Sequence, residues 1–247
     1  MILQNRPLPS QSEPPRNALL TALPFEDLNR LRPHCQHVTL VAEQVLHEPG
    51  EPAGEVYFVE DGLVSLVADT GEAESVEVGM IGREGLVGAV ALLDPGAVAT
   101  HRAVVQVPGH ALRMGVAAFR GAAGQSPALR DLCLRHLQTL LVQASQAAAC
   151  NARHGLSERL ARWLLLMHDR MDGDALPMRQ ATLGQVLGVR QAGVSTALGA
   201  LGAKGVICQG RKRIAVMDRP GLEAEACSCY RTIRDNERRI MGAPPAG

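Results

Sequence analysis

Apolar residues follow two different spacings in the first half of the chain. In residues 19–33 they recur at helical spacing, which predicts a short helix. From Val38 to Met114 they form short runs that are rich in β-branched residues or alternate with polar ones. Asp61-Gly62 and Pro108-Gly109 separate such runs and are typical of turns between two strands. Many short strands joined in this way predict an antiparallel barrel or sandwich.

A long helix is predicted over residues 126–152. The segment contains no glycine or proline after Pro127 and is rich in leucine, glutamine and alanine. Its apolar residues step by three and four positions, which places them on one stripe, as in a coiled coil. We expect this stripe to form a dimer interface, and the alternative is a helix that packs on its own domain. The stripe consists of Leu134, Leu137, Leu141, Ala144 and Ala148.

A second helix is predicted from Glu158 to Met171, after a break at Gly155. We expect Ser157 to be its N-cap, because a serine side chain can accept a hydrogen bond from the first helical turn. The only tryptophan, Trp163, lies on the apolar face of this helix. We therefore assign it to the core and give it no role in binding a ligand.

Residues 180–199 have the spacing of a helix-turn-helix. This motif needs a small residue where the second helix crosses the first, and Gly184 fits. Four positions later it needs a residue that accepts positive φ, and Gly188 fits. Apolar residues stand at the inward-facing offsets: Leu183, Leu187, Val189, Val194 and Ala197. An ordinary helical hairpin is the alternative.

The polar residues of this segment are candidates for contact with DNA. A recognition helix reads base edges through its N-terminal side chains, which here are Arg190, Gln191, Ser195 and Thr196. Arg179 and Gln180 begin the first helix, where phosphates are contacted. Residues 206–208 and 214–217 read as two strands of a wing, and a basic turn joins them. The turn carries Arg211, Lys212 and Arg213, which suit a phosphate backbone.

Composition and charge are consistent with two parts that have different partners. The net charge is zero, but residues 1–150 carry −6 and residues 151–247 carry +6. Hydrophobic residues make up 46% of the chain, and aromatic residues only 2%, so aliphatic side chains must build the cores. No apolar run is long enough to span a membrane, and the Pro-rich residues 1–18 resemble a flexible leader rather than a secretory signal. Six cysteines form no disulfide framework, and we expect a cytoplasmic protein.

The order of these parts resembles the Crp–Fnr superfamily of bacterial transcription regulators. The resemblance covers roughly residues 20–230 and rests on four segments: Val56–Val64, Ser157–Leu164, the helix-turn-helix and Asp218–Glu223. It implies an α+β chain with an N-terminal antiparallel β-roll of the cyclic-nucleotide-binding, jelly-roll type, a long dimerisation helix and a C-terminal winged helix-turn-helix. It also implies a homodimer that binds a two-fold symmetric duplex DNA site near a promoter and contacts RNA polymerase.

The resemblance divides the chain into five parts. A sensor domain of residues 19–125 follows the leader, and the dimerisation helix of residues 126–152 follows the sensor. A DNA-binding domain of residues 153–230 and a tail of residues 231–247 complete the chain.

The sensor departs from the pattern of the family's cyclic-AMP members. Those members bind the ribose through a glutamate and the cyclic phosphate through an arginine. The matching stretches here place Ala89, after Gly88, at the glutamate position and His101 at the arginine position. Arg102 is one position away and would point to the opposite face of a strand. We therefore expect no cyclic-AMP binding of the usual kind, unless a register shift lets Arg102 serve.

The sequence gives little support for an iron–sulfur cluster, a metal site or a redox centre. The family's iron–sulfur members use an N-terminal cysteine cluster, but Cys35 is the only cysteine before residue 133. His34 and His37 beside it are interpreted as surface residues, and no metal site is expected. A redox role for Cys208, Cys227 or Cys229 stays open beside inert packing. The chain has no set of nucleophile, base and orienting group, so it is not expected to be an enzyme.

Three functional interpretations remain. The first is a DNA-binding regulator, with or without a working sensor. The second is a cyclic-nucleotide-gated regulator. The third, from a different class, is a sensor module whose winged helix docks a protein partner.

Overall fold

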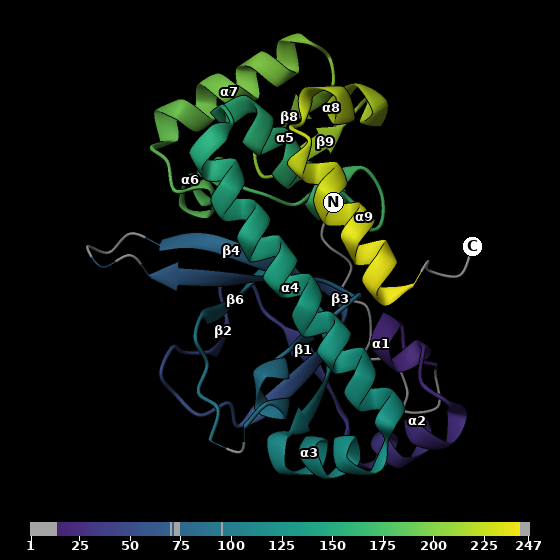
Figure 1. Ribbon diagram of the computed structural model, residues 1–247. Helices are drawn as coiled ribbons and strands as arrows, with labels where there is room; N and C mark the ends of the chain where they lie inside the picture. Colours follow the sequence, from purple (N-terminus) through teal and green to yellow (C-terminus); the bar gives the residue numbers. More distant parts are fainter. Residues whose placement is uncertain (1–13, 70, 72–74, 95, 243–247) are drawn as a thin grey trace.

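The N-terminal half is built on one antiparallel sheet. A computed structural model describes residues 14–69, 71, 75–94 and 96–242 (Figure 1). The sheet has the order β1-β6-β3-β4, and its short strands β2 and β5 pair with β6 and β3. It curls into a roll without closing as a barrel, in agreement with the expected fold class. The strands are β1 (Gln36–Leu40), β2 (Val45–His47), β3 (Glu55–Asp69), β4 (Ser75–Ile81), β5 (Leu86–Val87) and β6 (Arg102–Gly115).

The two turns predicted inside this sheet are wrong. Asp61-Gly62 lies within β3, and Pro108-Gly109 lies within β6, so each expected hairpin is one long strand. The two sites face each other, and the register between β3 and β6 shifts there. A Cβ atom at Gly62 would lie 2.6 Å from the carbonyl oxygen of Val107, and one at Gly109 would lie 2.3 Å from that of Asp61. Glycine is therefore needed because two bent strands approach closely, as in paired β-bulges.

The N-terminal helix predicted over residues 19–33 is interrupted. It forms α1 (Ala18–Thr21), α2 (Phe25–Leu31) and the 3-10 turn η1 (Arg32–His34), and Pro24 is the N-cap of α2. The expected leader, residues 1–18, lies mostly outside the described residues. Its end is ordered, because the buried Asn17 caps α1 and donates hydrogen bonds to the carbonyls of Val59 and Gly85.

Two helices follow the sheet. Helix α3 (Val116–Gln125), which the sequence patterns did not reveal, leads into α4 (Pro127–Arg153). The hydroxyl of Ser126 accepts from the amide of Leu129 at 3.0 Å and caps α4. Helix α4 extends from the roll to the C-terminal half (Figure 1). Its face toward the rest of the chain buries Leu129, Cys133, His136, Thr139, Gln143, Ala147 and Cys150.

The C-terminal half has the predicted winged helix-turn-helix. Helix α5 starts one residue before Ser157, and Gly155 is its N-cap. The amide of Gly155 donates to the Glu158 carboxylate at 2.9 Å, so the expected cap at Ser157 is wrong. Strand β7 was not expected and extends the wing to three strands in the order β7-β9-β8. The elements are α5 (Leu156–His168), β7 (Ala175–Leu176), α6 (Gln180–Leu187), α7 (Gln191–Ala203), β8 (Ile207–Gln209), β9 (Ile214–Val216) and α8 (Arg219–Glu225).

The residues expected as a C-terminal tail form a helix up to Met241. Helix α9 (Cys229–Met241) lies beside α4 (Figure 1). It buries Cys229, Tyr230 and Ile233, while charged residues cover its outer side. The segment has few apolar residues, and they lie after the expected end of the winged domain. Their pattern alone therefore did not predict a packed helix.

The two halves meet through partly buried polar contacts. Trp163 belongs to the core, as expected, but its indole N–H also donates to the Glu77 carboxylate on β4 at 2.7 Å. The hydroxyl of Ser65 donates to the same carboxylate. Arg170, after α5, binds Glu84 of the sensor at 2.7 Å and Glu237 of α9 at 3.1 Å. The side chain of Arg170 thus joins three parts of the chain.

Glu77 makes the contact between the two halves dependent on pH. Burial raises the pKa of its carboxyl from 4.5 to about 7, although hydrogen bonds from Ser65 and Trp163 oppose this shift. The folded protein therefore keeps a proton on Glu77 that the unfolded chain releases near pH 4.5. This stabilisation is complete below pH 4.5 and is lost as pH rises through 7. From pH 5 to pH 8, the wild type should lose roughly 2–3 kcal/mol of unfolding free energy relative to Glu77→Gln.

Urea unfolding at several pH values tests this expectation. Other titrating groups are common to both proteins, so only the difference between them reports on Glu77. The fluorescence of Trp163, the single tryptophan, gives a local reading of the same titration. Parallel pH profiles for the wild type and Glu77→Gln would contradict the assignment.

Candidate nucleic-acid interface

The helix-turn-helix has the local geometry that its spacing predicted. Gly188 ends α6 with a φ of +63°, in the left-handed region. A Cβ atom at Gly184 would lie 3.1 Å from the carbonyl oxygen of Val189, which shows why a small residue stands at the crossing. Leu183, Leu187, Val194 and Ala197 are buried, and Val189 packs against the same core. These contacts hold α7 at a fixed angle across α6.

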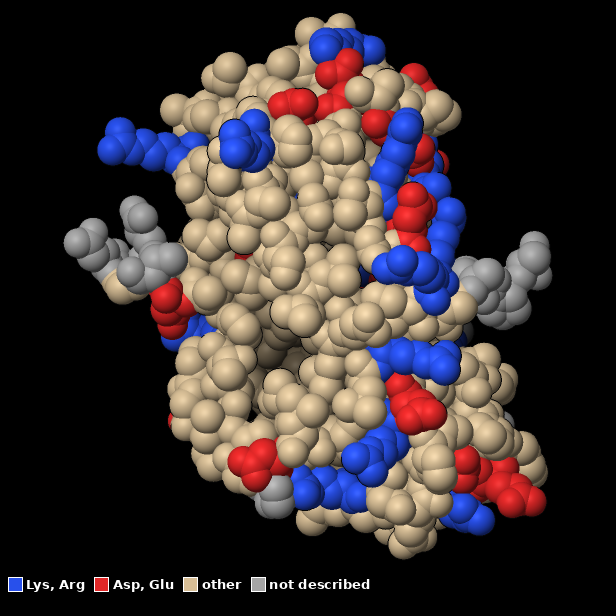
Figure 2. Space-filling model, viewed as in Figure 1, with Lys and Arg blue, Asp and Glu red and all other residues tan. Residues whose placement is uncertain are grey.

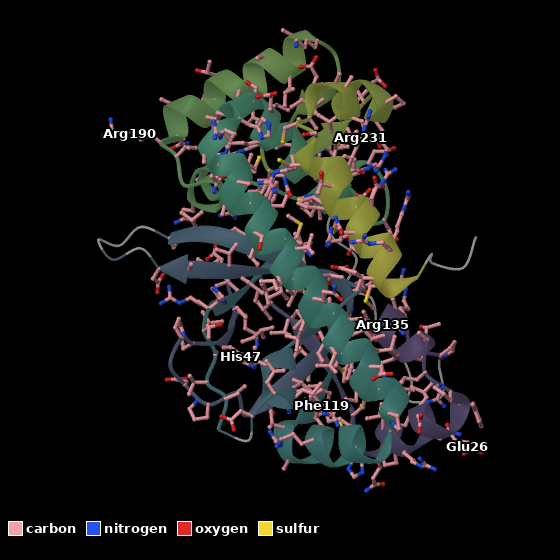
Figure 3. The ribbon with its side chains drawn as sticks, viewed as in Figure 1. Glu26, His47, Phe119, Arg135, Arg190 and Arg231 are labelled. Atoms are coloured by element: carbon pink, nitrogen blue, oxygen red, sulfur yellow. The ribbon has the colours of Figure 1, made fainter. Side chains whose placement is uncertain are left out.

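The polar residues expected to read bases lie at the exposed start of α7. Arg190 is the N-cap residue, and its side chain projects away from the body of the domain (Figure 3). Gln191, Ser195 and Thr196 are exposed on the following turns. The hydroxyls of Ser195 and Thr196 donate to the carbonyls of Gln191 and Ala192, both at 3.1 Å. The first half of α7 therefore presents a cation, an amide and two hydroxyls on one side.

The residues assigned to phosphates lie before α6, at its start and in the wing. Arg179 is exposed before α6, and the amide of Gln180 donates to the hydroxyl of Ser195. Gln180 thus holds a base-reading candidate in place, a contact that the sequence did not reveal. Arg211, Lys212 and Arg213 lie in the exposed turn between β8 and β9. No ion pair joins these three cations to a carboxylate of the described residues, so their charges are available to a phosphate backbone.

Most of the expected dimer stripe on α4 lies at the surface of the single chain. Leu141 is 67% exposed and Leu134 40%, values that are high for leucine on a long helix. Ala148 is exposed, whereas Leu137 and Ala144 are half-buried. Residues 136–152 contain no Lys, Arg, Asp or Glu. The side of the molecule that carries α4 accordingly has a broad uncharged area at its centre (Figure 2).

The residues of the expected effector pocket lie in two places. Gly88, with a φ of +88°, and the buried Ala89 start the 3-10 turn η2 (Ala89–Leu92). His101 directly precedes β6 and Arg102 is its first residue, and the hydroxyl of Thr100 is 2.9 Å from Nδ1 of His101. No hydrogen bond or ion pair among the described residues links the two places.

Arg102 already has two carboxylate partners. Its Nε atom lies 2.8 Å from the Glu48 carboxylate, and its Nη2 atom lies 3.5 Å from that of Asp69. Burial alternates along β6, and Arg102 shares a face with the half-buried Val104 and Gln106 rather than with the buried Ala103 and Val105. The guanidinium is therefore neutralised on the face away from the core of the roll.

The cysteines fall into different environments. Cys208 on the wing is exposed, and Cys35 forms no metal-binding group with His34 and His37 among the described residues. Cys227 and Cys229 are buried against Cys150 at the end of α4. Burial raises the pKa of the Cys227 thiol to about 12, and a thiol in this state is a poor nucleophile. This is unfavourable for a redox role of Cys227.

Comparison with known proteins matches each half of the chain to a domain family. Residues 37–126 match the cyclic nucleotide-binding domain, and residues 158–225 match the Crp-like helix-turn-helix domain. The global nitrogen regulator of Nostoc sp. is 24% identical over 186 residues, which cover 72% of this chain and 83% of that protein. In the described part of this chain, no helix is long and apolar enough to cross a membrane.

Solved structures share the fold. FixK2 from Bradyrhizobium japonicum aligns with a TM-score of 0.68 and 21% identity, over 78% of this chain and 98% of that one. The c-di-GMP responsive global regulator CLP from Xanthomonas campestris aligns with a TM-score of 0.64 and 18% identity, over 78% and 99%. The matching domains and relatives are those of transcription regulators and not of enzymes, as expected. The chain therefore belongs to the Crp–Fnr family of transcription regulators.

Proposed function

We propose that the protein acts as a homodimer and binds a two-fold symmetric site on duplex DNA through α7 and the wing. The observation that carries this proposal is the exposed polar start of α7, together with three cations on the wing that form no ion pair with the described residues. The uncharged, leucine-bearing face of α4 supports the dimer. Two copies joined along α4 would present their recognition helices to successive major grooves, about 34 Å apart. Contact with RNA polymerase at a promoter belongs to the same proposal and rests on the family.

We further propose that the sensor does not bind cyclic AMP in the usual way. Ala89 has no carboxylate to offer a ribose hydroxyl. Arg102 would have to leave both Glu48 and Asp69 before it could pair with a cyclic phosphate. An effector of other chemistry, or none, would bias the arrangement of the roll against α4. We likewise expect no iron–sulfur cluster at the N-terminal side, where Cys35 stands alone among the described residues.

Selection of bound fragments from random duplex DNA, with and without cyclic AMP, tests both proposals. Enrichment of a palindrome without nucleotide is the expected result. A palindrome that appears only with cyclic AMP would keep the DNA-binding role and overturn the proposal for the sensor. Failure to retain any DNA at low salt would overturn the DNA-binding role in favour of a winged helix that docks a protein.

Replacing Arg190 by alanine should weaken binding to the selected site by roughly 1–3 kcal/mol, about a 5- to 150-fold loss of affinity. The guanidinium at the start of α7 is exposed and has the paired donors that a bidentate contact with guanine requires. Because this contact reads a base, the loss should be confined to the specific site. Fluorescence anisotropy with the selected duplex and with an unrelated duplex measures the two affinities.

The wing provides the matching control. Neutralising Arg211, Lys212 and Arg213 together removes phosphate contacts, so affinity should fall on both duplexes and the salt dependence should become shallower. Equal losses on both duplexes for Arg190→Ala would show that Arg190 contacts the backbone and not a base.

A further inference from the structure

Four potential metal ligands converge where α4 ends and α9 begins. They are the side chains of Cys150, His154, Cys227 and Cys229, and their donor atoms all lie within 4.8 Å of one another. The sulfur atoms of Cys150 and Cys227 are 3.4 Å apart, and the sulfur of Cys229 is 3.4 Å from Nδ1 of His154. The first distance is a non-bonded contact and not a disulfide.

The fold brings these four residues together from two distant segments. Cys150 and His154 are four positions apart at the end of α4, a spacing that puts both side chains on one face. Cys227 and Cys229 flank Ser228 where α8 has ended and α9 starts. The Cys-x-Cys pair is visible in the sequence, but its partners stand about 75 residues earlier. Only the packing of α9 beside α4 joins the two pairs.

The donor set suits a soft divalent cation. Three thiolates and one imidazole form one of the common ligand sets of structural zinc. Ligand bonds of about 2.3 Å for sulfur and 2.0–2.1 Å for nitrogen in a tetrahedron imply donor separations of roughly 3.5–3.8 Å. The two contacts of 3.4 Å already come close to this range, and none of the separations exceeds 4.8 Å. Small side-chain movements would therefore complete the coordination.

Two arginines lie near the donor atoms and would offset the charge of a zinc–thiolate centre. Zinc with three thiolates and a neutral imidazole carries one net negative charge. Arg159 and Arg162 on α5 lie close enough for their charges to act on Cys150. Arg162 is only 6% exposed, and the Nε atoms of both arginines are buried without a hydrogen-bond partner among the described residues. A buried arginine, Arg162, and a half-buried one, Arg159, thus lie near the thiols, and the Nε donor of each is unused among the described residues.

The site is closed and has a further supporting contact. The side-chain amide of Gln146 donates to the sulfur of Cys229 at 3.0 Å, in the manner of groups that orient metal-bound thiolates. Cys150, Cys227 and Cys229 are all at most 5% exposed, and His154 is half-buried. Four protein ligands leave no open position for substrate, which distinguishes a structural zinc site from a catalytic one.

We propose that Cys150, His154, Cys227 and Cys229 bind one Zn²⁺ ion, which fastens the start of α9 to the end of α4. The ion stabilises the junction at His154 and Gly155, where α4 gives way to α5 and the DNA-binding domain begins. Binding converts three thiols to thiolates and releases their protons to solvent, so affinity rises with pH. A zinc ion here would contradict the expectation from sequence that the chain holds no metal.

Metal content of the full-length, reduced protein tests the proposal. The protein is stripped with a chelator, incubated with Zn²⁺, desalted and analysed by elemental mass spectrometry. We expect about one zinc ion per chain, and a higher melting temperature than that of the stripped protein. Substitution with Co²⁺ should produce the intense visible bands of a tetrahedral thiolate site. Both readouts are independent of DNA binding, so they do not depend on the proposed function.

Matched cysteine variants locate the ion. Cys150→Ser and Cys229→Ser should each lose the stoichiometric zinc and the cobalt spectrum, whereas Cys208→Ser, on the exposed wing, should retain both. Circular dichroism identifies a variant that has failed to fold, and His154→Asn then provides a second, smaller change at the same site. Less than stoichiometric zinc in the wild type, zinc retained by the cluster variants, bound iron with sulfide, or a Cys150–Cys227 disulfide in the reconstituted protein would each overturn the proposal.

Discussion

Replacing Arg170 by methionine is expected to lower the free energy of unfolding by about 3–5 kcal/mol. The guanidinium is almost completely buried and forms ion pairs with Glu84 and Glu237, and it also donates to the carbonyl of Leu166 at 2.9 Å. Methionine has a similar length but no charge, so two half-buried carboxylates would remain without their cation. Because the three residues belong to the sensor, the DNA-binding domain and α9, the whole chain should be destabilised. Chemical denaturation at neutral pH measures the change.

Two further variants separate charge from packing. Arg231→Met changes an exposed arginine on α9 and should alter stability by no more than about 0.5 kcal/mol (Figure 3). Combining Arg170→Met with Glu84→Gln and Glu237→Gln removes the unpaired charges and should recover much of the loss. The defect of Arg170→Met should also shrink in acid, where the carboxyls take up protons. A defect that is independent of pH and unaffected by the two glutamines would contradict the ion-pair explanation.

Replacing Leu141 by glutamate is expected to convert the proposed dimer into monomers. Leu141 is 67% exposed in the single chain, so glutamate should be tolerated by the monomer fold. In the dimer it would place a carboxylate from each chain in an apolar interface. Burying such charges without partners costs at least about 3 kcal/mol, which is roughly a hundredfold in the dissociation constant of the dimer. Analytical ultracentrifugation over a range of concentrations measures this constant.

Leu93 offers a matched control for Leu141. It is 64% exposed and is the C-cap residue of η2 in the sensor, so it is not one of the stripe residues of α4. Leu93→Glu should therefore leave the dissociation constant unchanged, and both variants should show the circular dichroism of the wild type. If Leu141→Glu remains dimeric at the concentrations where the wild type does, the dimer interface does not involve this face of α4.

The winged helix-turn-helix could be predicted in detail because its requirements are local. Gly184, Gly188 and the inward apolar positions lie within about twenty residues. Each is required sterically where two helices cross at a short turn. The length of α4 could be predicted equally well, because a long segment without glycine or proline has few alternatives to helix. These elements therefore lie close to where the residue pattern placed them.

The bends in the sheet could not be predicted in the same way. Asp61-Gly62 and Pro108-Gly109 have the residues of hairpin turns, but the structure uses their glycines for close contact between two long strands. Turn propensity describes a few consecutive residues and carries no information about the strand opposite. Pairing between β3 and β6 overrides it.

The sequence by itself determined the order of the parts, the helix-turn-helix and the family to which the chain belongs. The tertiary structure alone decided which distant side chains meet: Glu77 with Trp163, Arg170 with two carboxylates, and Cys150 and His154 with Cys227 and Cys229. Periodic patterns report which face of an element is buried, because burial acts on every turn or strand alike. They do not report which element covers that face, since the partner is selected by packing over the whole chain. The polar contacts between parts of the chain, including the proposed zinc site, depend on that selection.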